Sequence, residues 1–274
     1  MKYTTSSCSY LSLLRIGMAV LLATGLIVAM FSSANHGGQA HAQGGAQLLL
    51  NEVEIDPPSS SDDACQYVEL RGTANSVVPS GTFFLSVNGE SGNFGSVSNA
   101  VDLSGVTVGT NGTITIILDP VNIAACPSRS YGSGTTFIFI DDAFSVVGGG
   151  AESYLLVDSP LAIADGDDID SNNDEVIDPA LTITVLDGFA LTVNDTLQAD
   201  YAPLLYDAFT QGGGNAELPD AASRCSGDLD PLDASAWVYG ELPGTPDDTV
   251  GPFSSPTNKA GYSLTPGATN GSCI

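Results

Sequence analysis

Histidine is almost missing from this chain. The sequence holds only two, His36 and His41, and both fall within the first 42 residues, which have the pattern of a cleaved leader. A mature chain without histidine excludes Ser-His-Asp and Cys-His catalysis, zinc sites with histidine ligands, and histidine general bases. A pair of carboxylates would still suffice for glycoside hydrolysis. We therefore expect a protein without catalytic residues, and keep a carboxylate-pair hydrolase as a disfavoured alternative.

Lysine and arginine are also scarce. The chain has 6 of them against 32 aspartates and glutamates, a formal net charge of −26. Lys2 and Arg15 lie in the leader, so the mature chain would hold 4 basic and 32 acidic residues, a charge of −28. Such a charge repels nucleic acid and anionic membranes and attracts divalent cations, although it can also serve solubility alone. We expect no nucleic-acid partner.

The first residues have the three parts of a secretory signal peptide. Two basic residues precede or flank an apolar run from Ile16 to Phe31, and Ala40-His41-Ala42 supplies a cleavage site. The run of 16 residues is shorter than the roughly 20 that a membrane-spanning helix needs. We predict a signal peptide over 1–42, secretion to the cell exterior or cell surface, no other membrane contact, and a single mature domain over 43–274.

Cysteine is rare but evenly paired. Of the 5 cysteines, Cys8 lies in the leader, and the mature chain keeps Cys65, Cys126, Cys225 and Cys273. An even number in an exported protein predicts two disulfides, among three pairings. Proximity in the sequence favours Cys65–Cys126 and Cys225–Cys273. No C-x2-C pair exists, which argues against zinc.

Helical periodicity is scarce after residue 42. Short runs rich in β-branched and aromatic residues alternate instead with Gly, Ser, Asn and Pro, which is the pattern of strands and turns. These runs are 46–55, 66–72, 81–89, 111–119, 135–141, 152–158, 181–191 and 235–241. They predict an all-β, antiparallel β-sandwich with long loops over 55–66, 158–181 and 211–235. A short helix is expected within Leu197 to Phe209.

Four short motifs follow one another along the chain. They are LLLNEVEIDPPSSSDDACQYVELRG (48–72), VDLSGVTV (101–108), PDAASR (219–224) and TPGATN (265–270). Their order resembles the lamin tail domain in its exported bacterial version, and the matching residues of the first motif are Asn51, Glu52, Asp56, Pro57, Glu69 and Leu70. Arg71 departs from that family, which usually has Asn there. The resemblance implies an immunoglobulin-like sandwich with a binding or scaffolding role and no catalytic residues.

Half of the fourteen residues from Asp165 to Asp178 are acidic, and this stretch resembles an acidic insert of bacterial lamin tail domains, here around 159–180. Its spacing also resembles the D-x-[DN]-x-D-x-x-x-D loops of dockerin and thrombospondin type 3 repeats. Calcium prefers six to eight oxygen ligands. The candidate calcium ligands are Asp168, Asp170, Asn172, Asp174, the Val176 carbonyl and Asp178. Glu175 stands where such loops usually have glycine, and a solvated loop without metal is the alternative.

Two further pairs of residues suggest other functions. Trp237 and Tyr239 could stack on a sugar, as in an adhesion or carbohydrate-binding module, although a lone Trp on a strand is more often buried. Glu52 and Glu69 could form a carboxylate pair on adjacent strands, which we interpret as structural. Our main expectation is a secreted binding or scaffolding domain, stabilised by calcium and disulfides, whose partner is an extracellular protein or glycan. A surface-layer or filament subunit that assembles with itself is a further alternative.

Overall fold

The computed structural model describes residues 48–55, 65–118, 131–141, 150–193, 198–211, 218–240, 242 and 264–272. All of them belong to one compact unit, Gly45–Ile274. The predicted signal peptide over 1–42 lies outside the described residues, and so do Cys126 and Cys273. Within the described ranges, no helix is both long enough and apolar enough to cross a membrane.

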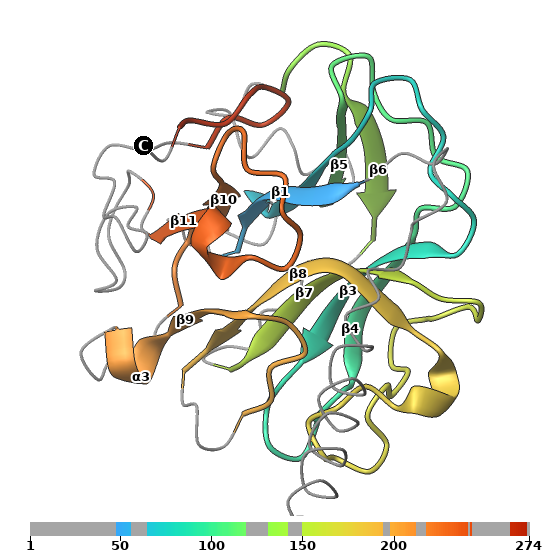
Figure 1. Ribbon diagram of the computed structural model, residues 1–274, viewed down its shortest axis with the longest axis vertical. Helices are drawn as coiled ribbons and strands as arrows, with labels where there is room; N and C mark the ends of the chain where they lie inside the picture. Colours follow the sequence, from blue (N-terminus) through green and yellow to red (C-terminus); the bar gives the residue numbers. More distant parts are fainter. Residues whose placement is uncertain are drawn as a thin grey trace, which may run out of the picture. The chain divides into compact units, whose positions relative to one another are not determined.

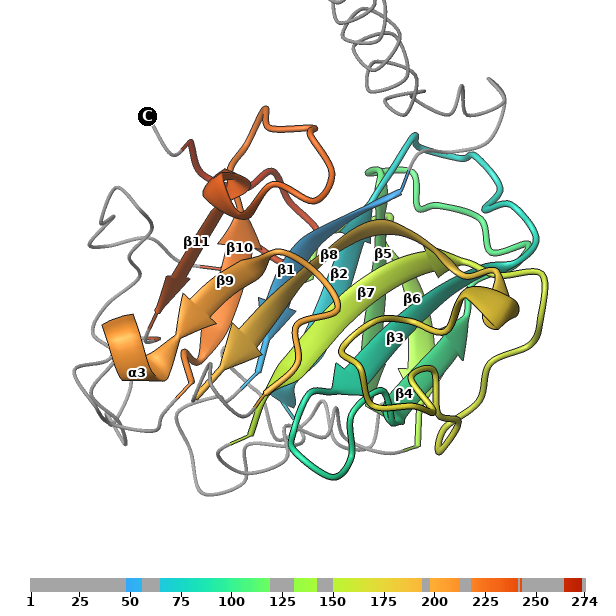
Figure 2. The same ribbon diagram turned by 60° about the horizontal axis from the view of Figure 1, so that its bottom comes forward.

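The described strands form two sheets packed face to face (Figure 1, Figure 2). The first sheet has the order β11-β10-β1-β2-β5-β6, with β1 Leu49–Glu54, β2 Tyr67–Arg71, β5 Thr113–Leu118, β6 Thr136–Ile140, β10 Ala221–Arg224 and β11 Trp237–Gly240. The second has the order β4-β3-β7-β8-β9, with β3 Thr82–Asn88, β4 Val97–Asp102, β7 Glu152–Asp158, β8 Thr184–Thr192 and β9 Leu204–Asp207. The predicted all-β sandwich is confirmed.

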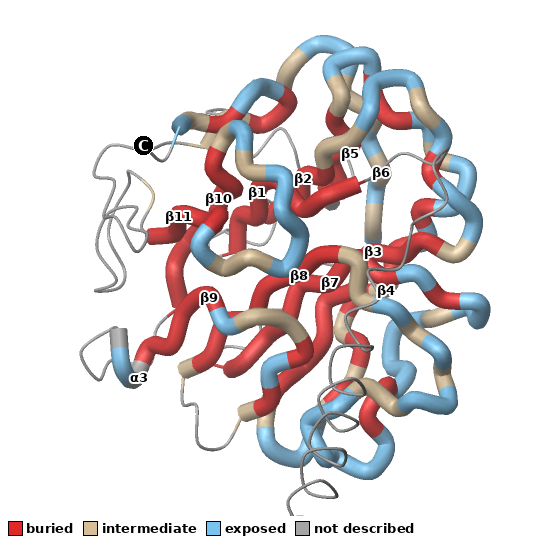
Figure 3. The backbone as a smooth tube through the Cα atoms, in the orientation of Figure 1, coloured by how far each residue is buried: buried red, intermediate tan, exposed pale blue. Residues whose placement is uncertain are grey.

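The main core lies between the two sheets because alternate residues of each strand point to the same face. Leu50 of β1 and Leu70 of β2 meet Phe84 of β3 and Leu156 of β7 in this core, and all four are fully buried. A chain of aromatic rings crosses the core, from Phe84 through Tyr154 and Phe189 to Trp237. Figure 3 shows the buried segments along the strands and the exposed ones in the connecting loops.

The outer face of the second sheet carries a second core. Phe83 and Leu85 of β3 point away from the first sheet and pack with Leu155 of β7. The loop between β7 and β8 covers them with Ile169, which is buried, and with partly buried apolar residues. Because both faces of the second sheet are covered, β3 and β7 are buried along nearly their whole length.

The sandwich is mostly but not wholly antiparallel. β5 pairs with β6 in parallel, and β8 pairs with β9 in parallel. Parallel neighbours cannot be joined by a tight hairpin and need a long connection, which explains the long stretches between these strands. The predicted antiparallel pairing is confirmed for most strand pairs, and the two parallel pairs at these edges were not expected.

All eight predicted runs contain a strand, with boundaries shifted by three residues or fewer at either end. Three strands were not predicted: β4, β9 and β10. The helix expected within Leu197 to Phe209 is mostly wrong, since β9 occupies part of that range and the short helix α3, Ala208–Gln211, begins only near its end. Two 3-10 turns complete the described elements, η2 at Pro179–Leu181 and η3 at Ala234–Ala236.

Candidate functional site

The acidic loop, residues 159–183, joins β7 to β8 and is anchored on the outer face of the second sheet. Its apolar residues Ile163, Ile169 and Ile177 face that sheet, so its polar residues are left to face solvent or the loop itself. The loop also pairs with the strand region that precedes β4, through a bridge between Ser96 and Asp168. The loop is therefore a packed element of the fold.

Asp170 is the centre of the acidic loop and is fully buried. Its Oδ1 accepts a hydrogen bond from the amide of Asp174 at 3.1 Å, and its Oδ2 accepts one from the amide of Glu175 at 2.9 Å. The Tyr201 hydroxyl donates to the same Oδ2 at 2.8 Å. Gly95, with φ +74°, lies against Asp170 so closely that a Cβ there would be 2.6 Å from the Asp170 amide nitrogen. The carboxylate thus holds the loop in a tight coil.

Two residues of the acidic loop adopt left-handed backbone conformations. Asn173 has φ +54° and Glu175 has φ +67°. Residues other than glycine adopt this conformation at a cost, and Asn tolerates it best. Glu175 occupies the place where a calcium loop usually has glycine, and its backbone has the positive φ that the turn requires. The departure from glycine therefore does not prevent the turn, because the buried Asp170 carboxylate binds the Glu175 amide.

The other predicted ligands make hydrogen bonds within the acidic loop. Asp168 Oδ1 accepts from the Asp170 amide at 2.9 Å, and Asp178 Oδ2 accepts from the Ser171 amide and hydroxyl at 3.2 and 2.6 Å. The Asn172 side-chain amide donates to Asp174 Oδ2 at 2.9 Å. The Val176 side chain is exposed.

These bonds bring the predicted residues into one loop without turning their side chains onto one point. Across the described residues, no group of three or more Asp, Glu, His or Cys side chains has the arrangement of a metal site. None of the loop carboxylates has a basic partner among the described residues, where Arg224 pairs with Asp187. Half of the residues from Asp165 to Asp178 are acidic, and no ion pair with a described residue balances their negative charge.

A second polar cluster lies on the outer face of the first sheet. Glu52 of β1 and Glu69 of β2 stand directly opposite each other in the antiparallel register, and both are fully buried. The hydroxyls of Tyr67 and Ser223 donate to Glu52 at 2.9 and 3.0 Å, and the Asn51 side-chain amide donates to Glu69 at 2.6 Å. The sequence placed this carboxylate pair on adjacent strands, and the register confirms that placement.

The segment Leu264–Ser272, which we call the C-terminal strap, covers this carboxylate pair. The Thr265 amide donates to both carboxylate oxygens of Glu52 at 3.0 Å, and the Gly267 amide donates to Glu69. The Asn270 side-chain amide donates to the Asn51 carbonyl at 3.1 Å. The strap has no regular secondary structure, so polar side chains of the sheet satisfy its backbone.

Burial raises the pKa of both carboxyl groups of this pair. Burial raises the pKa of Glu52, while its hydrogen bonds from Thr265, Tyr67 and Ser223 lower it again in part. Burial, with a contribution from the Glu52 charge, raises the pKa of Glu69 to about 8. Two buried carboxyl groups side by side cannot both ionise easily, and with a pKa of about 8 Glu69 keeps its proton at neutral pH. The strap excludes water from it, which fits a structural role.

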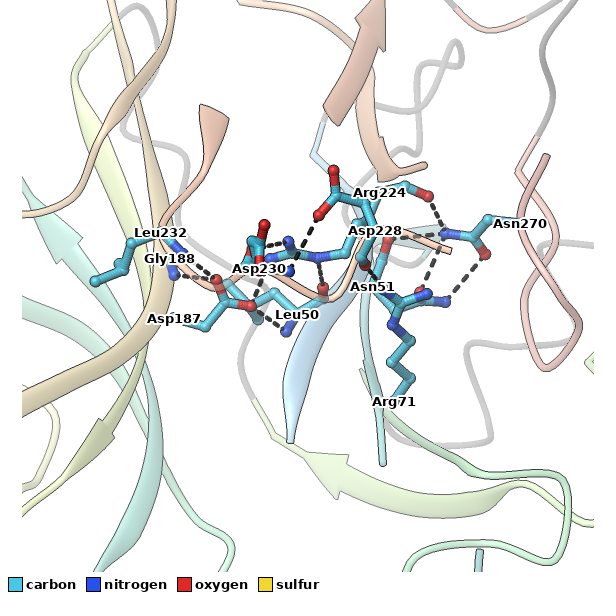
Figure 4. A network of polar contacts seen from close by, with 10 residues as sticks. All are labelled: Leu50, Asn51, Arg71, Asp187, Gly188, Arg224, Asp228, Asp230, Leu232 and Asn270. Atoms are coloured by element: carbon cyan, nitrogen blue, oxygen red, sulfur yellow. Dashed lines mark hydrogen bonds and ion pairs between the residues drawn. The ribbon is translucent and has the colours of Figure 1, made fainter. Parts of the chain in front are cut away.

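A buried ion pair joins the two sheets at the other end of this network (Figure 4). Arg224 of β10 lies 2.5 Å from Asp187 of β8, and both side chains are fully buried. Asp187 also accepts from the amides of Leu50 and Leu232, at 2.9 and 3.0 Å. The Arg224 guanidinium lies over the Trp237 ring, 4.7 Å from its centroid. Nothing in the separate sequence segments signals this long-range pair.

The proposed sugar-stacking pair is not available as a surface. Trp237 is fully buried against Phe189, and Tyr239 is 7% exposed and packs on Tyr206. Both side chains point into the core between the sheets. The core role that we expected for a lone Trp on a strand is confirmed, and the alternative of an exposed aromatic platform at these two residues is wrong.

Arg71, the departure from the lamin tail pattern, lies at the end of β2 and is partly buried. Its Nη2 donates to the backbone carbonyl of Asp228, and its buried Nε makes no hydrogen bond to any described residue. Burial, together with the nearby Arg224 charge, lowers the pKa of Arg71. Arg71 borders a hollow of about 680 Å³ between the strap and the turn before β5.

Glu152, the first residue of β7, is a buried acid that the sequence did not single out. It is 1% exposed, and neither carboxylate oxygen makes a hydrogen bond to a described residue. Burial raises its pKa to about 8, the Glu90 charge adds to this, and the nearby Ser86 and Ser98 hydroxyls lower it without reaching normal hydrogen-bond geometry. The run ESYLLVD predicted a strand at this position, but it did not indicate that the Glu152 side chain would be buried.

Cys65 and Cys225 are both disulfide-bonded. Cys126 and Cys273 lie outside the described residues, so the pairing remains a prediction. Comparison with known protein families, with curated proteins and with solved structures finds no match for this chain.

Proposed function

We propose that this chain is a secreted, non-catalytic binding or scaffolding domain whose acidic loop takes up calcium. The observation that carries the proposal is the acidic loop itself, where half of the stretch from Asp165 to Asp178 is acidic and no basic side chain among the described residues lies against it. Its backbone already has the tight turn at Glu175 that calcium loops need. The carboxylates of the loop repel one another, and a divalent cation would offset that repulsion, since no described lysine or arginine does.

The residues that would hold the ion are Asp168, Asp170, Asn172, Asp174, the Val176 carbonyl and Asp178. Carboxylate, amide and carbonyl oxygens are the donors that calcium prefers. When bound, the ion would supply charge neutralisation and a rigid cross-link within the loop. Because the same loop covers the outer core of the second sheet, a stiffer loop would stabilise the whole sandwich.

Calorimetric titration of the metal-free mature protein tests the proposal. Extracellular calcium modules have dissociation constants of about 0.1 to 1 mM. At one hundred times the dissociation constant, binding adds about 2.7 kcal/mol of stability, which should raise the melting temperature by several degrees. EDTA should reverse that rise, and magnesium at equal concentration should not reproduce it.

Matched variants separate the loop from general charge effects. Asp174→Asn and Asp178→Asn each remove one exposed or half-exposed carboxylate from the loop, and each should weaken calcium binding roughly tenfold or more. Asp141→Asn removes one exposed carboxylate after β6 and should leave binding unchanged. Absence of calcium binding at millimolar concentration, or equal loss in all three variants, would end the calcium part of the proposal.

The clustering of the motifs supports the resemblance to lamin tail domains. Asn51 and Glu52 of the first motif, Arg224 of the third and Asn270 of the last lie in one network, although up to 219 residues separate them. A binding or scaffolding role agrees with a carboxylate pair that the strap covers and no substrate can reach. An extracellular protein or glycan remains the proposed class of partner.

A further inference from the structure

Among the described strands, β6 is the last strand of the first sheet. It pairs in parallel with β5 through five continuous residue pairs, and the sheet ends with it. In Figure 1 it lies at the opposite side of that sheet from β11. No other described strand pairs with its second edge. An edge strand presents unpaired backbone N–H and C=O groups that can hydrogen-bond to another strand.

The side chains of β6 lack the features that usually protect an edge. Phe137 and Phe139 point to the outer face, where they are 37% and 51% exposed. Their rings are stacked with centroids 6.3 Å apart, and the Tyr131 ring meets Phe137 edge-on at 5.4 Å. Ile138 and Ile140 alternate with them and pack partly against the main core. The strand has no lysine, proline or bulge, which are the common means of blocking edge pairing.

The sequence of β6 is self-complementary about Ile138. If a second copy of β6 is placed antiparallel with Ile138 opposite Ile138, then Phe137 of each copy stands opposite Phe139 of the other. Both phenylalanines lie on one face, so this register brings four rings into a single ladder across a twofold axis. Aromatic pairs directly across an antiparallel ladder are among the most stabilising. We propose that two copies of this chain associate through their β6 edges in this register.

The charge at this edge favours a second copy over a basic peptide. β6 itself is uncharged, and the first acidic residue beyond it, Asp141, would face Thr135 of the other copy and not another Asp141. A basic peptide would need acidic side chains along the strand, and β6 offers none. Each copy carries a large negative charge, −26 for the full chain and −28 without residues 1–42. This charge opposes association at long range, so added salt should strengthen the dimer by screening.

The expected dimer is weak. One edge strand of five residues covers much less than the roughly 1,200–2,000 Å² of a standard stable interface. We therefore expect dissociation constants of about 10 μM to 1 mM. A twofold contact closes on itself, so assembly should stop at two copies and produce no filament.

Sedimentation equilibrium of the mature protein from about 1 μM to 1 mM tests the association. The mean mass should rise toward twice that of the monomer, and more steeply in 0.5 M than in 0.05 M sodium chloride. Phe139→Lys should weaken the dimer roughly tenfold or more, because it places a charge on the pairing edge. Leu161→Lys is the matched control, since Leu161 is 52% exposed against 51% for Phe139 but lies in the acidic loop. It should dimerise like the unaltered protein.

Cross-linking tests the register. A mixture of Phe137→Cys and Phe139→Cys proteins under mild oxidation should yield the mixed 137–139 disulfide in clear excess over 137–137 and 139–139 products. A monomer at all concentrations, equal weakening by Leu161→Lys, growth beyond two copies, or a random distribution of cross-links would overturn the proposal. Association through β6 does not require calcium. Sedimentation without added metal therefore tests the dimer separately from the proposed calcium binding by the acidic loop.

Discussion

Replacing Glu152 by Gln should remove a loss of stability that the unaltered protein suffers as pH rises. The carboxyl group has a pKa of about 8 in the folded protein, raised by burial, against 4.5 when unfolded. Between these values the folded chain keeps the proton and the unfolded chain releases it. Stability from this group is therefore fully present below about pH 4.5 and is lost as pH rises through 8. This is the opposite of a salt-bridged carboxylate.

The size of the effect follows from the two pKa values. Each pKa unit corresponds to about 1.4 kcal/mol, so the difference between 4.5 and about 8 corresponds to about 5 kcal/mol of stability lost across that range. Domains are usually stable by only about 5–15 kcal/mol. Glu152→Gln removes the ionisation and keeps nearly the same shape. We expect the variant to exceed the unaltered protein by several kcal/mol at pH 9 and to differ by about 1 kcal/mol or less at pH 5.

Urea unfolding with the disulfides intact, at pH 5, 7 and 9, measures this difference by linear extrapolation. The new amide is buried at every pH, so its own cost cancels from the pH dependence. Glu69 also has a raised pKa, but it is present in both proteins and cancels as well. Glu90→Gln, the same change at a partly exposed neighbour, is the control and should have little effect. A variant whose advantage is the same at pH 5 and pH 9 would refute the reasoning.

Three further predictions concern the buried contacts. Arg224→Met leaves Asp187 buried without its ion-pair partner and should lower the free energy of unfolding by about 3–5 kcal/mol. Adding Asp187→Leu should recover part of that loss. A double variant less stable than Arg224→Met would contradict this. Asn270→Ala removes the hydrogen bonds by which the C-terminal strap holds Asn51, Ser223 and Arg224. It should cost about 2–3 kcal/mol, with faster hydrogen exchange at Ser226, which bonds to the strap. Trp237→Ala should cost about 3–5 kcal/mol in urea, and an undiminished unfolding midpoint would show that its ring is not in the core.

The sequence was sufficient for the strongly apolar strands and insufficient for the short polar ones. The run around β7 has a Tyr-Leu-Leu-Val core that indicates a buried strand in any context. β10 consists of Ala221 to Arg224, and a run of two alanines, a serine and an arginine has no strand signal of its own. It becomes a strand because β1 and β11 lie on either side of it. Such strands depend on tertiary pairing, which local pattern cannot predict.

The candidate sites show the same division. The spacing of the acidic residues predicted that Asp170 and Asp174 lie in one loop, because a ligand motif is a short pattern that can be read from the local sequence. Burial of Asp170 and its bond to Tyr201 could not be predicted, since they depend on how the loop packs on the second sheet. Likewise, the carboxylates of Glu52 and Glu69 were visible as a pair, but the strap that covers them comes from residues about 200 positions away.

The position of β1 in the middle of the first sheet has a consequence for folding. β1 pairs with β2 soon after it in the chain, but its other neighbour is β10, and the bond between Glu52 and Ser223 spans 171 residues. Contacts between residues this far apart in the sequence slow folding, because the chain loses the entropy of closing a long loop before the stabilising contacts form. While the intervening residues are still being made, one side of β1 stays open to other chains. Efficient production of this protein should therefore depend on protecting β1 until β10 arrives.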